Sequence, residues 1–408
     1  MSFIDAPRRS TTRRWMFLVH LWLGLIVGPI VGVVNLTGAV IVFRYEINRK
    51  TTPGTAYVTP QSRRLPFDDL AARVQAARPA DKLRTVGWEA GPDTAWNFRA
   101  QSPDGHRIHT FIDQYSGEIT GRDDYHDQWM QWFYDLHADL LAGDRGEFLN
   151  GFVGLATLVL GLTGLIVWWP GTSHWLFGFR YAWRTRWKRQ NYDLHKVVGF
   201  YSSLAVMIIA LSGMTYSFPL LSKRLAERVT GTKVMTDTPK ATTRWTDRRV
   251  PMEAFIQAAQ QAQPGAAAVQ LNVPQKPGDP VTVRTKEPHD WHRIGLNYVY
   301  LEPGDGRVIS SIRFSEANAG TRAILFMYPL HFGRFGGHWN TTATYGVMAF
   351  YVILGIAPFV LMVTGLLMYW NRSLVKKWRR LRAQGPATGA GLAGDVMSGP
   401  HPSRLPGR

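Results

Sequence analysis

The chain has 408 residues and a formal net charge of +18, and 45% of its residues are hydrophobic. It contains no cysteine, which excludes structural disulfides, cysteine-ligated iron–sulfur clusters and covalent attachment of a c-type haem. Its basic residues cluster beside apolar stretches rather than on one folded face, which argues against nucleic-acid binding.

Four apolar stretches predict four transmembrane helices, because each reaches the length of about 20 residues that a helix needs to cross a bilayer core. They lie near residues 15–43, 148–169, 197–218 and 344–370. The first is too long for a cleavable signal peptide, and no small-residue cleavage site ends it before Arg44. Buried helices of a soluble protein are disfavoured, because such stretches recur with charged flanks.

The order of these stretches predicts the organisation of the chain. Its segments are an N-terminus with the first transmembrane helix (residues 1–44), a first outer domain (45–125), an interfacial helix with the second transmembrane helix (126–170), a basic loop (171–190), the third transmembrane helix (191–222), a second outer domain (223–320), an interfacial helix with the fourth transmembrane helix (321–372) and a basic tail (373–408). The tail is rich in Gly, Pro, Ala and Ser, which predicts disorder.

The first apolar stretch is repeated as the third. From His20 the chain reads HLWLGLIVGPIVGVVNLTG, and from His195 it reads HKVVGFYSSLAVMIIALSG, with a glycine four residues after each histidine. The other two stretches echo each other as well. FYDLH ending at His137 precedes a stretch that ends LTGLIVWW, and MYPLH ending at His331 precedes one that ends VTGLLMYW. The chain is therefore a duplication, and each copy carries two matched histidines.

Alternating apolar residues and Gly and Pro breakers predict that the two outer domains are matching α+β units. The first has a helix at 67–77 and strands at 85–89, 95–100 and 107–114; the second has a helix at 251–262 and strands at 268–273, 281–285 and 296–301. An aromatic segment follows each unit, at residues 126–141 and 322–335. Aromatic belts are typical of the membrane interface, so both segments predict short interfacial helices.

Lys and Arg residues set the expected orientation. They cluster before the first stretch, in the loop 171–190 and after the fourth stretch, whereas both long connections mix the two signs of charge. By the positive-inside rule, both termini and the basic loop are cytoplasmic and both long connections lie outside.

His20 and His195 lie inside the apolar slab, where an ionisable residue indicates a functional site. Gly24 and Gly199, one turn further along, would leave room for a flat macrocycle, although such glycines also let helices pack closely. If the copies are parallel repeats about an axis along the membrane normal, equivalent histidines face each other at equal depth. His20 then pairs with His195 near the cytoplasm.

His137 pairs with His331 near the outside by the same argument. Two imidazoles on opposite faces of an iron porphyrin make a six-coordinate haem b suited to electron transfer, so the four histidines are predicted axial ligands of two haems per chain. Zinc is disfavoured, because two histidines fill half of its tetrahedral shell.

The other histidines lack this repeated setting. His174 and His338 are reserve candidates without a counterpart in the other copy. The histidines of the outer domains lack ligand spacing and are predicted to lie on the solvated surface; they are His106, His109, His289 and His292.

The sequence resembles the PepSY-associated transmembrane family over roughly residues 10–380. The marks are Arg14-Trp15 with His20-Leu21-Trp22 and Gly24, the Tyr-Asp-Leu-His and Tyr-Pro-Leu-His segments, and Thr-Gly-Leu at Thr163 and Thr364. The resemblance implies a mainly α membrane protein, with four transmembrane helices from a duplicated unit and two inserted periplasmic α+β PepSY-like domains. It further implies a multi-pass protein of the bacterial inner membrane that holds two haems b and reduces ferric siderophores or other ferric chelates.

Two other functions remain open. One is a cytochrome b subunit that passes quinol electrons to a periplasmic redox partner, and the other is a non-redox regulatory or binding protein of PepSY type. The electron donor, a quinol or a cytoplasmic reductant, has no visible motif, since Gly-x-Gly-x-x-Gly after a strand is absent. No catalytic residue is assigned, and the candidates for holding the substrate are outer aromatic and cationic residues: Trp129, Trp132, Arg334 and Trp339.

Overall fold

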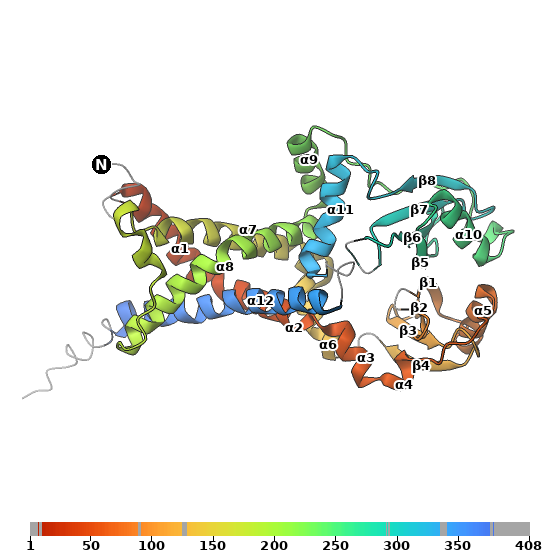
Figure 1. The fold of residues 1–408 in the computed structure, drawn as a ribbon, viewed down its shortest axis with the longest axis horizontal. Helices are drawn as coiled ribbons and strands as arrows, with labels where there is room; N and C mark the ends of the chain where they lie inside the picture. Colours follow the sequence, from red (N-terminus) through yellow and green to blue (C-terminus); the bar gives the residue numbers. More distant parts are fainter. Residues whose placement is uncertain are drawn as a thin grey trace, which may run out of the picture.

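Long apolar helices form one end of the molecule and a β-sheet forms the other in the computed structural model (Figure 1). The structure describes residues 7, 10–88, 91–124, 129–290, 292, 294–334, 341–375 and 378. The reserve ligand His338, the substrate candidate Trp339 and the tail beyond residue 380 lie outside the described residues.

Among the described residues, three helices are long and apolar enough to cross a membrane: α7 (Gly143–Trp168), α8 (Trp187–Ser217) and α12 (Thr341–Tyr369), which η4 (Trp370–Leu374) continues. Helix α8 packs against both α7 and α12, and the first apolar stretch completes the bundle by packing against α7 and α12. The bundle is apolar around most of its surface, as a bilayer environment requires.

The first apolar stretch is not one helix, so the prediction of a single helix there was wrong. It forms α1 (Thr11–Ile26) and α2 (Gly28–Ile41), which meet at Val27 with a bend of 65°. The cause is Pro29, which has no N–H to donate and whose ring would collide with the carbonyl four residues earlier. Counted together, α1 and α2 are a fourth candidate span.

Short elements connect the bundle to the sheet or close its ends. They are α3 (Arg44–Thr51), α4 (Pro53–Ala56), α6 (Trp129–Asp139), η2 (Thr172–Phe179), α9 (Pro219–Thr230), η3 (Trp245–Asp247) and α11 (Ala319–Phe332). Helix α6 packs against α2 and α7, and α11 packs against α8 and α9 (Figure 1). Helices α6 and α11 occupy the two predicted aromatic segments.

Each outer unit contains one helix and four strands. The first has α5 (Phe67–Ala77), β1 (Lys82–Gly87), β2 (Trp96–Gln101), β3 (Arg107–Ile112) and β4 (Ile119–Asp124). The second has α10 (Met252–Ala262), β5 (Ala267–Asn272), β6 (Val281–Lys286), β7 (Asn297–Leu301) and β8 (Val308–Ile312). Both helices and the first three strands of each unit confirm the predictions to within a few residues. The fourth strands, β4 and β8, were missed because these edge strands show little alternation of apolar residues.

The two units share one antiparallel sheet with the order β4-β3-β2-β1-β5-β6-β7-β8. Strands β1 and β5 join them, and Val86 opposite Leu271 marks the centre of a two-fold relation between the units. Helices α5 and α10 cover the sheet face that points away from the bundle (Figure 1). The shared core contains Phe67, Phe98 and Phe255, all fully buried. The opposite face of the sheet is turned towards α11 and the bundle.

Candidate functional site

The histidine pair farther from the sheet, here called the distal pair, consists of His20 on α1 and His195 on α8. Their ring centres are 6.3 Å apart and their planes are at 87°. The Nδ1 atoms of His20 and His195 lie 3.1 Å from Thr163 Oγ1 and 2.8 Å from Thr364 Oγ1, respectively. Thus the residues that the repeat predicted to pair do lie together.

The threonine hydroxyls define which ring nitrogen is protonated. Thr163 Oγ1 donates to Val159 O at 2.6 Å, and Thr364 Oγ1 donates to Val360 O at 2.7 Å. Because each hydroxyl has already used its proton, it accepts from the histidine, whose Nδ1–H is the donor. The lone pair of each neutral ring is then on Nε2, as a metal ligand requires.

The pair nearer the sheet, here called the sheet-side pair, consists of His137 on α6 and His331 on α11. Their ring centres are 5.9 Å apart with an interplanar angle of 29°. His137 Nδ1–H donates to Val34 O at 2.7 Å, and His331 Nδ1 lies 3.2 Å from Ile209 O. Carbonyl oxygens only accept, so Nδ1 is again the donor.

Ser212 supports His331 in the same way as the threonines support the distal pair. Its Oγ lies 3.3 Å from His331 Nδ1 and donates to Ile209 O at 2.7 Å. Across the described part of the chain, no residue forms a hydrogen bond with Nε2 of any of the four histidines. All four rings therefore have the same chemical state, with Nδ1 engaged and Nε2 available.

A glycine lies against each histidine ring. A Cβ added at Gly38 or Gly213 would come within 2.7 Å of Cε1 of His137 or His331, respectively. At Gly164 and Gly365 the corresponding distances are 3.2 Å to His20 and 3.4 Å to His195. Each glycine directly follows a hydroxyl residue: Thr37, Ser212, Thr163 and Thr364.

The sequence argument missed the position of these hydroxyl–glycine pairs against the histidine rings. The repeated Leu-Thr-Gly, Leu-Ser-Gly and Thr-Gly-Leu segments were recognised only as marks of the duplication. The sequence signal that could have identified them is their number, because the repeated segments contain four such pairs and four matched histidines.

Gly24 and Gly199 differ from the glycines that contact the rings. A Cβ at Gly24 would lie 3.7 Å from Leu160 Cδ2, and one at Gly199 would lie 3.5 Å from Leu361 Cδ2, which are ordinary contacts. Close helix packing therefore does not require glycine at either position. It does at Gly32, where an added Cβ would lie 2.8 Å from Met362 Sδ.

The spacing within each pair fits a metal bound between the two rings. A metal–imidazole bond is about 2.0–2.1 Å long, so two such bonds on opposite sides of one metal place the ring centres about 6 Å apart. The observed separations are 6.3 Å and 5.9 Å. No cluster of three or more His, Cys, Asp or Glu side chains suited to a metal occurs within the described ranges. Two-histidine sites fit iron porphyrin, which brings four equatorial nitrogens of its own, better than zinc.

The two pairs lie at opposite ends of the bundle. Ser212, which contacts His331, follows His195 by 17 residues on the continuous helix α8. At the α-helical rise, 17 residues span roughly 26 Å. This distance is close to the thickness of a bilayer core, about 30 Å.

Two histidines of the outer units are less exposed than the sequence predicted. His292, between β6 and β7, is only 4% exposed and its ring meets Tyr328 edge-on at 4.6 Å, and His109 on β3 is half-buried. Burial, followed by the charges of Arg99, Arg44 and Arg107, lowers the pKa of His109 to about 3. His106 and His289 are exposed, as predicted.

The predicted substrate contacts have different environments. Trp129 and Trp132 are 58% and 51% exposed, respectively. Arg334 is buried and forms an ion pair with Glu46 on α3 at 2.8 Å. Its charge is therefore already compensated within the protein.

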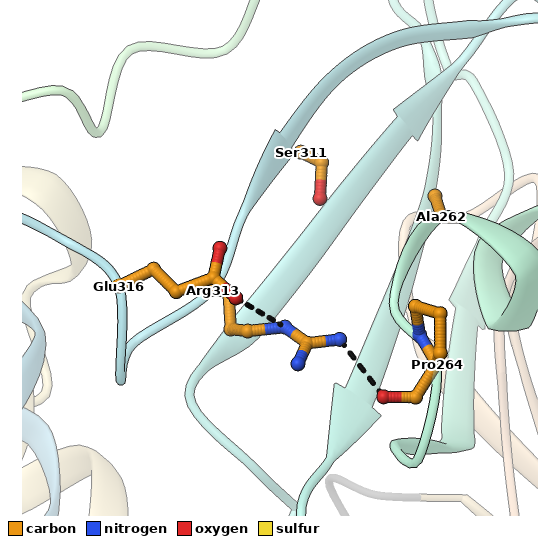
Figure 2. Close-up of a pocket in the computed structure, with 5 residues that line it drawn as sticks. All are labelled: Ala262, Pro264, Ser311, Arg313 and Glu316. Carbon is orange, nitrogen blue, oxygen red and sulfur yellow. Dashed lines mark hydrogen bonds and ion pairs between the residues drawn. The ribbon is translucent and has the colours of Figure 1, made fainter.

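A cavity of about 400 Å³ lies between the end of α10 and strand β8 (Figure 2), and no histidine lines it. Arg313 crosses it, donating to Pro264 O at 3.0 Å and lying 3.3 Å and 3.5 Å from Glu287 and Glu316, respectively. The arginine is fully compensated, so its role here is to attach β8 to the end of α10.

The apolar bundle defines the class as an integral membrane protein, and two histidine pairs lie within it. The family model for the PepSY-associated TM region matches residues 17–372, and the chain belongs to this family. No curated protein matches the chain.

Proposed function

We propose that the protein holds two haems b, one at each histidine pair, and carries electrons across the bacterial inner membrane to reduce a ferric chelate on the periplasmic side. The observation that supports this most strongly is the shared state of the four histidines. Each has Nδ1 engaged by an acceptor, Nε2 available and a partner ring at the separation that axial ligation requires.

The protein's own residues fix the ligands in place. The hydroxyl and carbonyl acceptors hold each Nδ1–H, and the glycines let each ring edge lie against a helix backbone. A haem bound there supplies one-electron exchange. Two histidines would hold the haem at each site, a ligand set that suits electron transfer rather than oxygen binding.

The reduction of the substrate makes few demands on the protein. One electron converts ferric iron to ferrous iron, and oxygen-rich chelators hold the less charged ion more weakly. No proton moves, so no general acid, base or nucleophile is required. The electron comes from a quinol or a cytoplasmic reductant and enters at the distal pair, and the chelate approaches the sheet-side pair.

Transfer from the reduced protein to a ferric siderophore tests this function. Protein reduced with dithionite under anaerobic conditions should be re-oxidised rapidly by the ferric siderophore, with ferrous iron appearing in step, and not by the iron-free chelator. Equal rates with and without iron would contradict iron as the substrate. Haem that stays reduced with every ferric chelate tried would favour the quinol-linked cytochrome.

The threonine behind His195 gives a second prediction. Thr364→Val removes the hydroxyl acceptor for His195 Nδ1–H and keeps the side-chain volume. Loss of such an outer-shell partner commonly weakens metal binding about 10–100-fold. The distal haem of this variant should transfer faster to a haem scavenger such as apomyoglobin.

Thr157→Val is the matched control for Thr364→Val. Thr157 is also buried in a long helix, but its hydroxyl donates only to Val153 O, one turn earlier on α7. This control should retain both haems like the unmodified protein. Equal haem retention in the two variants would mean that Thr364 does not support the ligand.

The orientation gives a third prediction. The Lys and Arg asymmetry supports an orientation with both termini and the basic loop in the cytoplasm and the sheet in the periplasm. Alkaline phosphatase fused after Thr55 or Thr232 should be active, and the same enzyme fused after Thr185 should be inactive. The reverse pattern would invert the proposed direction of electron flow.

A further inference from the structure

The sheet face that points towards the bundle carries two equivalent arginines. Arg99 is the fourth residue of β2 and Arg284 is the fourth residue of β6. Strands β2 and β6 correspond in the two units and flank the central β1–β5 pair. The two-fold relation between the units therefore places these arginines on either side of its axis, on one face of the sheet.

Both arginines line a cavity of about 170 Å³ between the sheet and α11. Its opposite wall is formed by Tyr328 and Phe332, which precede and follow His331 on α11. The ring of Phe332 lies 5.7 Å from that of His331. The cavity is therefore directly adjacent to the sheet-side histidine pair, on the side from which a periplasmic ligand would approach.

Arg284 is a buried cation without a counter-charge. It is 8% exposed, and its Nη2 donates to Gly295 O at 2.7 Å. Its Nε has no hydrogen-bond partner, and its guanidinium lies over the rings of Tyr298 and Tyr328 at 5.0 Å and 5.8 Å. Within the described segments, no carboxylate pairs with Arg284. A buried, unpaired charge is costly, which indicates that an anion compensates it.

The surroundings of Arg284 add further positive potential. Arg99 and Arg334 line the same cavity, and Arg334 is paired with Glu46. Burial, followed by the charge of Arg99, lowers the pKa of His109 to about 3. The contribution of Arg99 indicates a positive field on this face of the sheet.

We propose that the arginines of this cavity bind carboxylate groups, held beside the sheet-side histidine pair. A guanidinium binds a carboxylate through two parallel hydrogen bonds, and the buried Nε of Arg284 has no hydrogen-bond partner among the described residues. The cavity is large enough for carboxylate arms but not for a whole ferric chelate. These carboxylate groups belong either to an anionic ferric hydroxycarboxylate or to the porphyrin at the sheet-side pair. In the first case the inference rests on the proposed function.

Gallium–citrate tests the first source without any redox reaction, because Ga³⁺ resembles Fe³⁺ in charge but is not reduced. Titration of the full-length, haem-loaded protein should show binding that Arg284→Gln weakens about tenfold or more, since one charge-assisted pair is lost. Arg284→Lys should recover part of the affinity. A gallium tris-hydroxamate, which has no carboxylate, should bind equally to all variants. Arg313→Gln is the control, because that arginine is compensated by Glu287.

Haem transfer to apomyoglobin tests the second source on the same proteins. If the porphyrin carboxylates are the ligand, Arg284→Gln and Arg99→Gln should release the sheet-side haem about tenfold faster, with gallium–citrate affinity unchanged. The inference is overturned if neither gallium–citrate affinity nor haem release differs between Arg284→Gln and the unmodified protein. Arginine-dependent gallium binding in a protein that reduces no ferric chelate would contradict the proposed function and leave this inference intact.

Discussion

Replacing His195 with alanine is expected to lower the haem content of the purified protein from two per chain to one. The imidazole of His195 lies opposite His20 at a ring separation of 6.3 Å, so its loss would remove one of the two residues proposed to hold the distal haem. The sheet-side pair is roughly 26 Å away along α8 and should be unaffected. His20→Ala should give the same result, as measured by haem extraction and protein quantification.

The reciprocal variants complete this test. His137→Ala or His331→Ala should remove the sheet-side haem and retain the distal one. Each of these four single variants should abolish electron transfer from the cytoplasmic side to a ferric chelate, because the electron must pass through both sites in series. His174→Ala is the control, because this exposed histidine lies in η2 beside Ser173 and faces no second histidine. Loss of both haems from every ligand variant, with normal folding, would contradict two independent sites.

Replacing Gly213 with alanine should disrupt the sheet-side haem without changing any ligand. The added Cβ would lie 2.7 Å from Cε1 of His331, closer than real Cβ contacts, so the ring must move. Ligand geometry tolerates little displacement, and the sheet-side haem should be lost or become high-spin in its absorbance spectrum. Gly38→Ala should act in the same way on His137, since the corresponding distance is also 2.7 Å.

Gly346→Ala is the matched control for these glycine variants. Gly346 also lies in a long apolar helix, α12, but an added Cβ would meet nothing within 4 Å. Alanine is favoured over glycine in a helix, so this variant should fold at least as well and keep both haems. A Gly213→Ala protein with an unchanged haem spectrum would mean that the glycine does not set the position of His331.

The sequence was sufficient to pair the histidines because the argument depended on symmetry and polarity. Equivalent residues of a parallel duplication lie at equal depth on either side of its axis, and an ionisable residue in an apolar helix favours the face turned towards the bundle interior. The partners of Nδ1 were not predictable, because they depend on which residues of α7 and α12 face α1 and α8. Thr163 and Thr364 are distant in sequence from the histidines that they support.

Other features required knowledge of packing. The bend at Val27 was readable from Gly28-Pro29, but the apolar run on both sides outweighed that signal in the prediction of one helix. The joining of β1 to β5 was not predicted, because strand alternation identifies strands and not their neighbours. Arg99 and Arg284 could be recognised as equivalent only after the strand boundaries were known.

The most direct test of the account is a reduced-minus-oxidised absorbance spectrum of the unmodified full-length protein, with haem extracted and quantified per chain. Protein matured with ample haem should contain two non-covalent haems b per chain, both low-spin and six-coordinate, because each histidine pair supplies both axial ligands. A haem-to-protein ratio near zero under these conditions would contradict the account and favour a non-redox role for the paired histidines.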